Sequence, residues 1–326
     1  MRASTKAPGR LGFNRSLSAG AQLYLLLGGI VVALFIVGEI VAGGFLSVSH
    51  IGNVLRTAAF LGIVAIGQTL VILTGGIDIS VGAVITMGNV FACMLMNGSN
   101  PATIWAVPVV LAIGAVVGLF NGFMIAYARI HPMVMTLATG SLVTGFTLIV
   151  SKGAPKGLAS PALQFIATRN IAQIPIVVMV WALLAAVTVV LLARSTFGRR
   201  IYYVGANERT AYLSGTRTRV VMLGTYVICG AAAALAGILM AGYTQTAFLG
   251  IGNEYTLWSI AAVVVGGTSL IGGRGGYVGT LLGAIILALL ESVLTIVQMP
   301  EAGRQIANGL IIVLMIGVHY ARARRR

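Results

Sequence analysis

The residues of this 326-residue chain that could do chemistry are polar side chains set within long apolar stretches. The three histidines, His50, His131 and His319, have no partners at metal-ligand spacing. The sequence contains no G-x-S-x-G, H-E-x-x-H or G-x-x-x-x-G-K-[ST] motif, so it offers no nucleophile elbow, zinc-protease helix or P-loop. We therefore expect a protein that is not an enzyme, holds no metal or cofactor of its own, and takes any ATP energy from another subunit.

Six polar residues are candidates for lining a solute path or its gates: Gln68, Asp78, Asn89, Asn121, Thr136 and Thr139. Amides and hydroxyls suit a neutral polyhydroxyl solute, which has many donors and acceptors of its own. An ion path would favour several facing carboxylates or a ring of carbonyls. The alternative for each residue is a hydrogen bond that holds two membrane helices together.

Acidic residues in apolar surroundings are costly and are therefore functional candidates. Asp78 stands in the polar break TGGID, where it and Ser80 could both accept N–H bonds at a helix start. We expect such capping to be its direct role. Glu39 is expected at a membrane interface, and Glu291 either pairs within the bundle or serves transport.

The composition indicates what kind of protein positions these residues. Apolar residues make up 58% of the chain, charged residues only 8%, and the mean hydropathy is +1.01. An average soluble domain has about 25% charged residues, and disordered chains are poor in apolar ones. Both classes are excluded, so most of this surface must face lipid. The 43 glycines indicate closely packed helices rather than a membrane β-barrel, because the apolar runs are long and continuous.

The predicted fold is all-α, a polytopic transmembrane bundle of about ten spans whose N- and C-termini are both cytoplasmic. The expected domain layout is a basic N-terminal segment (1–20), a transmembrane domain (21–320) and a basic tail (321–326). The spans are predicted at 21–43, 55–74, 80–96, 104–127, 132–150, 174–193, 220–242, 257–272, 277–297 and 304–320. A weak internal repeat relates 73–87 to 271–285, each a glycine-rich break followed by small residues.

The distribution of Lys and Arg gives this orientation. Sixteen of the 21 lie on the inner side: Arg2, Lys6, Arg10, Arg15, Arg129, Arg194, Arg199, Arg200, Arg209, Arg217, Arg219, Arg274, Arg322, Arg324, Arg325 and Arg326. Five lie outside: Arg56, Lys152, Lys156, Arg169 and Arg304. The positive-inside rule explains this bias, and the net charge of +15 then needs no nucleic acid partner.

The longest inner segment, 194–219, contains the most specific local pattern, GANERTAYLSG at 205–215. Asn207 can cap a short helix, Glu208 lies near its positive end, and Gly215 can end it. Ala211 with Tyr212 or Leu213 could present an apolar face to a soluble partner. The sequence leaves equally open a surface loop whose arginines only maintain the topology.

Four segments together resemble the permease subunits of ribose-type bacterial ABC importers. They are LTGGIDISVGAV (73–84), GLFNGFMIAYARIHPMVMTLATGS (118–141), FGRRIYYVGANERTAYLSG (197–215) and VVVGGTSLIGGRGGYVGTLLGAIIL (263–287). The similarity runs in order from about residue 50 to 320. The chain departs from the family at SGTRTR (214–219) and in the methionines of HPMVMTL (131–137).

The resemblance implies a multi-pass protein of the bacterial cytoplasmic (inner) membrane that imports a monosaccharide, such as ribose or another pentose or hexose. Its implied partners are a cytoplasmic ABC ATPase that binds ATP-Mg, a periplasmic or lipid-tethered substrate-binding protein, and a second permease subunit, identical or related. It also places Asp78 and Asn121 at the central path or its gates. The segment coupled to the ATPase is implied to include Gly205, Asn207, Glu208, Ala211, Ser214 and Gly215.

Two other functions stay open. One is a related permease for branched-chain amino acids, nucleosides or another small solute, since TGGIDIS could also receive a carboxylate at a helix N-terminus. The other is an ATP-independent facilitator, for which a long basic inner segment has no evident use.

Overall fold

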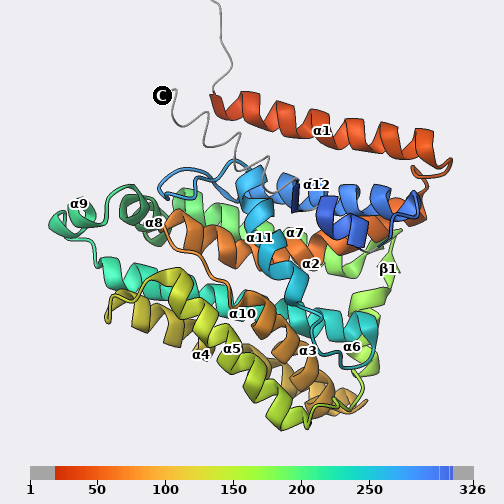
Figure 1. Ribbon diagram of the computed structural model, residues 1–326, viewed down its shortest axis with the longest axis horizontal. Helices are drawn as coiled ribbons and strands as arrows, with labels where there is room; N and C mark the ends of the chain where they lie inside the picture. The colour runs from red at the N-terminus through yellow and green to blue at the C-terminus, as the bar shows by residue number, and fades with distance from the viewer. Residues whose placement is uncertain (1–18, 301, 308, 311–326) are drawn as a thin grey trace, which may run out of the picture.

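The structure, a computed structural model, describes residues 19–300, 302–307 and 309–310 as a bundle of helices with one short two-stranded sheet (Figure 1). Seven of the helices in this described part are long and apolar enough to cross a membrane. They are α1 (Ala19–Val41), α2 (Val48–Leu73), α4 (Asn100–Ala126), α5 (Pro132–Ser151), α7 (Ile176–Arg194), α10 (Thr218–Thr244) and α12 (Tyr277–Ile296). The prediction of a polytopic helical bundle is confirmed at this level.

Two of the predicted spans are shorter helices. The span predicted at 80–96 is α3 (Val81–Met96), whose 16 residues reach about 24 Å at 1.5 Å per residue. The span predicted at 257–272 is wrong in its second half, because α11 (Asn253–Val265) stops at Val265. Glycines explain why α11 ends there. Four glycines between 266 and 276 adopt positive φ, which is incompatible with a right-handed helix.

Some predictions fall on residues that the structure does not describe. The span at 304–320 lies mostly outside the described residues, and so do the basic segments at 1–20, apart from its last two residues, and at 321–326. The helices α2 and α3 are separated by a break at 74–80, and α11 and α12 by a break at 266–276. These two breaks overlap the segments 73–87 and 271–285, which were compared above as a weak repeat.

Short elements occupy the two ends of the bundle. Residues 151–173, expected as a loop, include α6 (Pro161–Thr168) and lead into the hairpin of β1 (Asn170–Ile171) and β2 (Ile174–Pro175). The segment 194–219 contains α8 (Thr196–Ala206) and α9 (Glu208–Leu213). Figure 1 shows α8 and α9 projecting at the end of the bundle opposite to α6 and β1.

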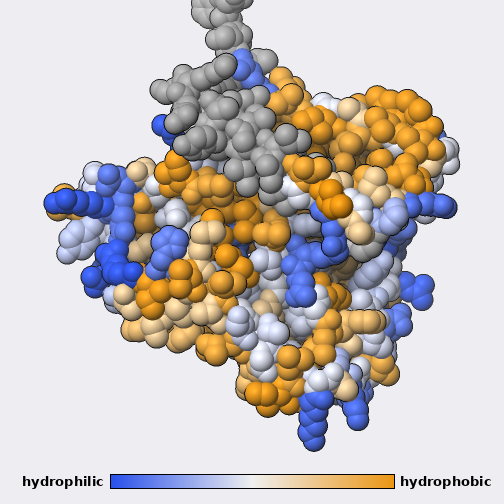
Figure 2. All heavy atoms as spheres, in the orientation of Figure 1, coloured by the Kyte–Doolittle hydropathy of each residue, from blue (hydrophilic) through white to orange (hydrophobic). Residues whose placement is uncertain are grey.

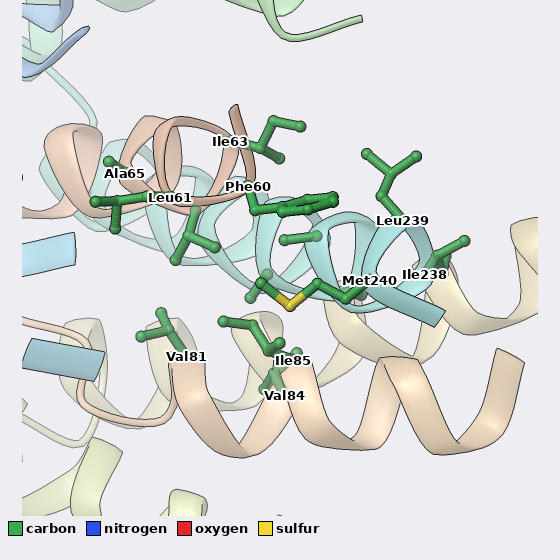
Figure 3. Close-up of a cluster of buried hydrophobic side chains, with 14 of the residues drawn as sticks. Phe60, Leu61, Ile63, Ala65, Val81, Val84, Ile85, Ile238, Leu239 and Met240 are labelled. Carbon is green, nitrogen blue, oxygen red and sulfur yellow. The ribbon is translucent and has the colours of Figure 1, made fainter. Parts of the chain in front are cut away.

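The long helix α10 lies at the centre of the packing, against α4, α3 and α2. Small residues permit this close approach: a Cβ at Gly118 would overlap the main chain of Tyr226, and one at Gly67 would overlap Cys229. Figure 3 shows apolar side chains of α2, α3 and α10 meeting in the core, among them Phe60, Ile85 and Met240. Both cysteines, Cys93 and Cys229, are buried and free, as expected for small apolar residues.

The outward faces of α4, α5 and α7 are apolar and exposed, with Ile104, Leu142 and Leu183 as examples. Figure 2 shows hydrophilic residues at the end formed by α8 and α9 and at the opposite edges, with much hydrophobic surface between. This distribution fits helices whose outer faces meet lipid and whose ends meet water.

Candidate functional site

The break at 74–80 forms a buried polar cluster. Asp78 Oδ1 accepts hydrogen bonds from the main-chain N–H of Ser80 (2.9 Å) and from Ser80 Oγ (2.6 Å). Asn121 Nδ2 of α4 donates to Ser80 Oγ at 3.0 Å. All three side chains are buried, with at most 1% exposed. Asp78 therefore accepts an N–H at the start of α3 as predicted, whereas the cap predicted for Ser80 is wrong, because its hydroxyl bonds Asp78 and Asn121 instead.

Thr136 joins the first turn of α5 to the same break. Its Oγ1 accepts from the main-chain N–H of Ile79 at 3.1 Å and donates to the carbonyl of Pro132 at 2.9 Å. Of the six path candidates, the structure thus brings Asp78, Asn121 and Thr136 together, from three segments distant in sequence. The break is held by polar contacts on two sides.

The other three candidates differ in their surroundings. Gln68 of α2 is fully buried, and its Oε1 lies 4.0 Å from Cys229 Sγ of α10. Thr139 lies one turn beyond Thr136 on α5 and is 3% exposed. Asn89 Oδ1 accepts the N–H of Phe248 at 2.8 Å, so Asn89 holds the connection between α10 and α11. This contact supports the structural alternative for Asn89.

Several buried polar atoms near these residues have no hydrogen-bond partner within the part of the chain that the structure describes: Gln68 Nε2, Asn89 Nδ2, Asn121 Oδ1, Thr139 Oγ1 and the Tyr226 hydroxyl. An unpaired buried polar group costs about 1–3 kcal/mol, so each such atom needs an explanation. Neutral donors and acceptors of this kind are what a polyhydroxyl solute could satisfy.

The short helix predicted in the segment 205–215 is present as α9. Asn207 is its N-cap, with Oδ1 accepting the N–H of Thr210 at 2.9 Å. Ser214 is its C-cap, and Gly215 follows at φ 80° with its N–H bonded to the Tyr212 carbonyl at 3.0 Å. The N–H of Thr216 reaches the carbonyl of Ala211, also at 3.0 Å. This pair of bonds is the Schellman arrangement, which needs a residue that tolerates positive φ.

The helix α9 presents apolar side chains to solvent and is tied to the loop between α4 and α5. Ala211 is buried, whereas Tyr212 and Leu213 are 69% and 76% exposed. Glu208 Oε1 pairs with Arg129 of that loop at 2.7 Å. The predicted apolar face is therefore present only in part: Ala211 packs inward, whereas Tyr212 and Leu213 are exposed and available to a partner.

The last turn of α8 lies directly against both helix breaks. The main-chain N–H of Gly273 donates to the carbonyl oxygen of Leu73 at 3.0 Å, which joins the break after α11 to the end of α2. A Cβ on Gly205 would overlap that same carbonyl oxygen. Tyr202, one turn earlier, donates its hydroxyl to the Gly275 carbonyl at 3.0 Å. Burial raises the pKa of Tyr202, which keeps this hydroxyl protonated as a donor.

Comparison with known proteins places these features in a family. Residues 50–318 match the family described as "Branched-chain amino acid transport system / permease component". The chain belongs to this family. The match covers both helix breaks, α8, α9 and every path candidate. The predicted resemblance to ABC import permeases is thereby confirmed, and the chain is a multi-pass membrane permease subunit of an ABC import system.

Individual relatives agree with this assignment. The ribose import permease protein RbsC of Bacillus subtilis is 36% identical over 286 residues, which cover 87% of this chain and 88% of the relative. The protein of the same name from Haemophilus influenzae is 33% identical over 289 residues, covering 87% and 89%. The autoinducer 2 import system permease protein LsrC of Shigella flexneri is 33% identical over 295 residues, covering 88% and 83%. No solved structure matches the chain.

The permease also contains polar contacts that sequence reasoning missed. Arg56, counted only as an outer charge, is 9% exposed and donates to Asn53 Oδ1 (2.8 Å), the Thr168 carbonyl (3.2 Å) and Asn170 Oδ1 (3.0 Å). It thereby holds α6 and the hairpin on α2. The sequence did contain a signal for these contacts, since an arginine inside an apolar stretch needs hydrogen-bond partners for its charge.

The remaining acidic residues of interest have structural partners. Glu39 accepts the N–H groups of Gly44 (3.1 Å) and Leu46 (2.8 Å), which fixes the turn after α1. Glu291 of α12 pairs with Arg304 at 3.1 Å, the first of the two alternatives left open by the sequence.

Proposed function

We propose that this chain is the membrane-spanning permease subunit of an ABC importer that moves a monosaccharide across the bacterial inner membrane. The names of the relatives support a sugar, since the ribose import permeases match over nearly the whole chain. Neutral amides and hydroxyls at the helix break support a polyhydroxyl solute over an ion. The single observation that carries the mechanism is the packing of α8 against both helix breaks at Gly205.

The partners in this proposal are those of a binding-protein-dependent importer. A cytoplasmic ABC ATPase binds ATP-Mg, a periplasmic or lipid-tethered binding protein delivers the sugar, and a second permease subunit, the same or a related chain, completes the path. This chain itself binds no cofactor and hydrolyses nothing. The α8–α9 end is assigned to the cytoplasm, which the inner count of arginines supports.

In the proposed mechanism α9 docks on the ATPase through Tyr212 and Leu213, which are exposed on this subunit. Movement of α9 and α8 is transmitted to the helix breaks through two contacts. The ion pair between Glu208 and Arg129 leads to the start of α5, where Thr136 bonds the break. The contact of Gly205 with Leu73 leads to the end of α2. The coupling residues have distinct roles: Gly205 contacts Leu73, Glu208 pairs with Arg129, Ala211 packs inward, and Asn207, Ser214 and Gly215 cap α9.

At the other end of these connections the break at 74–80 serves as a gate. Asp78, Asn121 and Thr136 hold the break closed, and Gln68 and Thr139 offer polar atoms to the solute when it opens. A path that opens alternately to either side moves solute against a gradient only if an energy source drives the change, and in this proposal that source is ATP binding and hydrolysis on the partner ATPase. This requirement separates an importer from a facilitator.

The proposal is tested by labelled ribose uptake into proteoliposomes that contain the permease, its ATPase and its binding protein. Uptake is expected only when all three and ATP are present. Undiminished uptake without the ATPase would show a facilitator. A complex that takes up leucine or a nucleoside but no pentose or hexose would show the alternative solute class named above.

A further inference from the structure

Among the residues that the structure describes, two tyrosines are fully buried, and their hydroxyls differ. Tyr277 of α12 is 1% exposed, accepts from Trp181 Nε1 at 2.7 Å and donates to the Gly62 carbonyl at 2.8 Å. Tyr226 of α10 is also 1% exposed, yet its hydroxyl has no hydrogen-bond partner within the described ranges. Tyr277 thus has a complete structural role in joining α2, α7 and α12, whereas the hydroxyl of Tyr226 has no hydrogen bond of this kind.

The Tyr226 hydroxyl is aimed at the helix break. A Cβ on Gly76 would overlap this oxygen, so the hydroxyl lies directly against the main chain of the break. The base of this side chain is held in place, because Gly118 and Gly122 of α4 pack against the main chain and Cβ of Tyr226. From this position the side chain places its oxygen against Gly76, within the break at 74–80.

A second unpaired atom accompanies it. Asn121 follows Gly118 on α4 by one turn, and while its Nδ2 donates to Ser80, its Oδ1 has no partner among the residues described. The break therefore has an unpaired hydroxyl on the α10 side and an unpaired amide oxygen on the α4 side. Leaving both unpaired in a closed bundle is costly, and any group that bonds them when the break moves is favoured.

We propose that Tyr226 contacts the transported solute, its hydroxyl making a hydrogen bond to one hydroxyl group of the monosaccharide when the break opens. Asn121 Oδ1 serves the same solute from the facing helix. This inference rests on the proposed function and adds a residue from α10 to the path. A phenol oxygen both donates and accepts, so it fits a polyhydroxyl solute and has no particular use for an apolar one.

The test compares Tyr226→Phe with the parent in proteoliposomes that contain the ATPase and the binding protein. The probes are labelled ribose and ribose analogues that each lack one hydroxyl group. Tyr226→Phe removes only the oxygen, so uptake of ribose at limiting concentration is expected to fall about 3- to 10-fold. For the analogue that lacks the partner hydroxyl, parent and variant are expected to be equal, because the bond is already missing.

Tyr277→Phe is the matched control, since it removes an equally buried hydroxyl that has two partners. It is expected to lower the melting temperature and to reduce ribose and all analogues by the same factor. A loss in Tyr226→Phe that is uniform across the analogues, or no loss at all while the parent takes up ribose, overturns the solute contact. A parent that takes up no pentose or hexose overturns the proposed function, and the contact with it.

Discussion

The carbonyl oxygen of Leu73 accepts the main-chain N–H of Gly273 at 3.0 Å, and Gly205 covers this bond without leaving space for a side chain. Leu73 ends α2 and Gly273 lies in the break between α11 and α12. The last carbonyls of a helix have no partner within that helix. Here the break after α11 supplies a partner for one of the last carbonyls of α2. The segment that covers them leads directly into α9, and a displacement of α8 therefore acts on both breaks.

The first prediction concerns Gly205→Ala. The added methyl overlaps the Leu73 carbonyl, and overpacking of this kind costs about 1–3 kcal/mol. We expect α8 to be pushed away from the breaks and ATP-dependent uptake to fall roughly tenfold, while the ATPase still binds. Uptake and ATP hydrolysis measured on the same proteoliposomes check this, because a coupling defect lowers the uptake per ATP.

Gly145→Ala of α5 is the matched control for this substitution. No atom lies within 4 Å of the position of a Cβ on Gly145, and the residue is in the middle of a helix. Alanine there is expected to leave uptake unchanged. Equal uptake per ATP in the parent and in Gly205→Ala would contradict the role of Gly205 in coupling.

Much of this architecture could be predicted from the sequence because lipid imposes a simple rule. A spanning segment needs about 20 apolar residues, and this rule located α1, α4, α5 and α7 to within a few residues. The helix α9 could also be predicted, because its start and end depend on residues within the segment itself: Asn207, Glu208 and Gly215. The helix α6 and the hairpin of β1 and β2 were missed because an eight-residue helix and two-residue strands are much shorter than the apolar run that this rule detects.

The contacts between distant segments could not be predicted in this way. Arg129 and Glu208 are 79 residues apart in sequence, and Asn121 and Ser80 are 41 apart. Hydropathy shows which residues lie in the membrane but not which helices face one another. The glycines of α4 and α10 could have hinted at close packing, but their partners become evident only in three dimensions.

The second prediction concerns the ion pair between Arg129 and Glu208. Both side chains are partly exposed, at 55% and 36%, so the pair contributes only about 0–1 kcal/mol to stability. We expect Glu208→Arg to leave the melting temperature within about 2 °C and to lower uptake severalfold, because α9 loses its link to the start of α5. The double reversal Arg129→Glu with Glu208→Arg is expected to restore uptake in part. No recovery in the double variant would mean that the pair does not transmit movement.

The third prediction separates the charge of Asp78 from its oxygen. Asp78→Asn keeps an acceptor for the N–H and hydroxyl of Ser80, so uptake is expected to stay within about threefold of the parent. Asp78→Ala leaves the main-chain N–H and the hydroxyl hydrogen of Ser80 without an acceptor, at about 1–3 kcal/mol each. It is expected to lower both the melting temperature and uptake. If Asn is as harmful as Ala, the negative charge itself is needed, and Asp78 does more than fix the start of α3.

The fourth prediction concerns the apolar tip of α9. Leu213 is 76% exposed beside Tyr212, and we expect it to insert into an apolar groove of the ATPase. Leu213→Ser removes apolar area worth about 1–2 kcal/mol when buried. The affinity of the permease for the ATPase, followed by co-purification, should therefore fall roughly tenfold. The stability of the isolated permease should not change, because the side chain packs on little within this subunit. Phe165→Ser, at the α6 end and 56% exposed, is the control and should retain full ATPase binding. The reverse result, binding lost with Phe165→Ser and kept with Leu213→Ser, would place the ATPase at the α6 end and invert the proposed orientation.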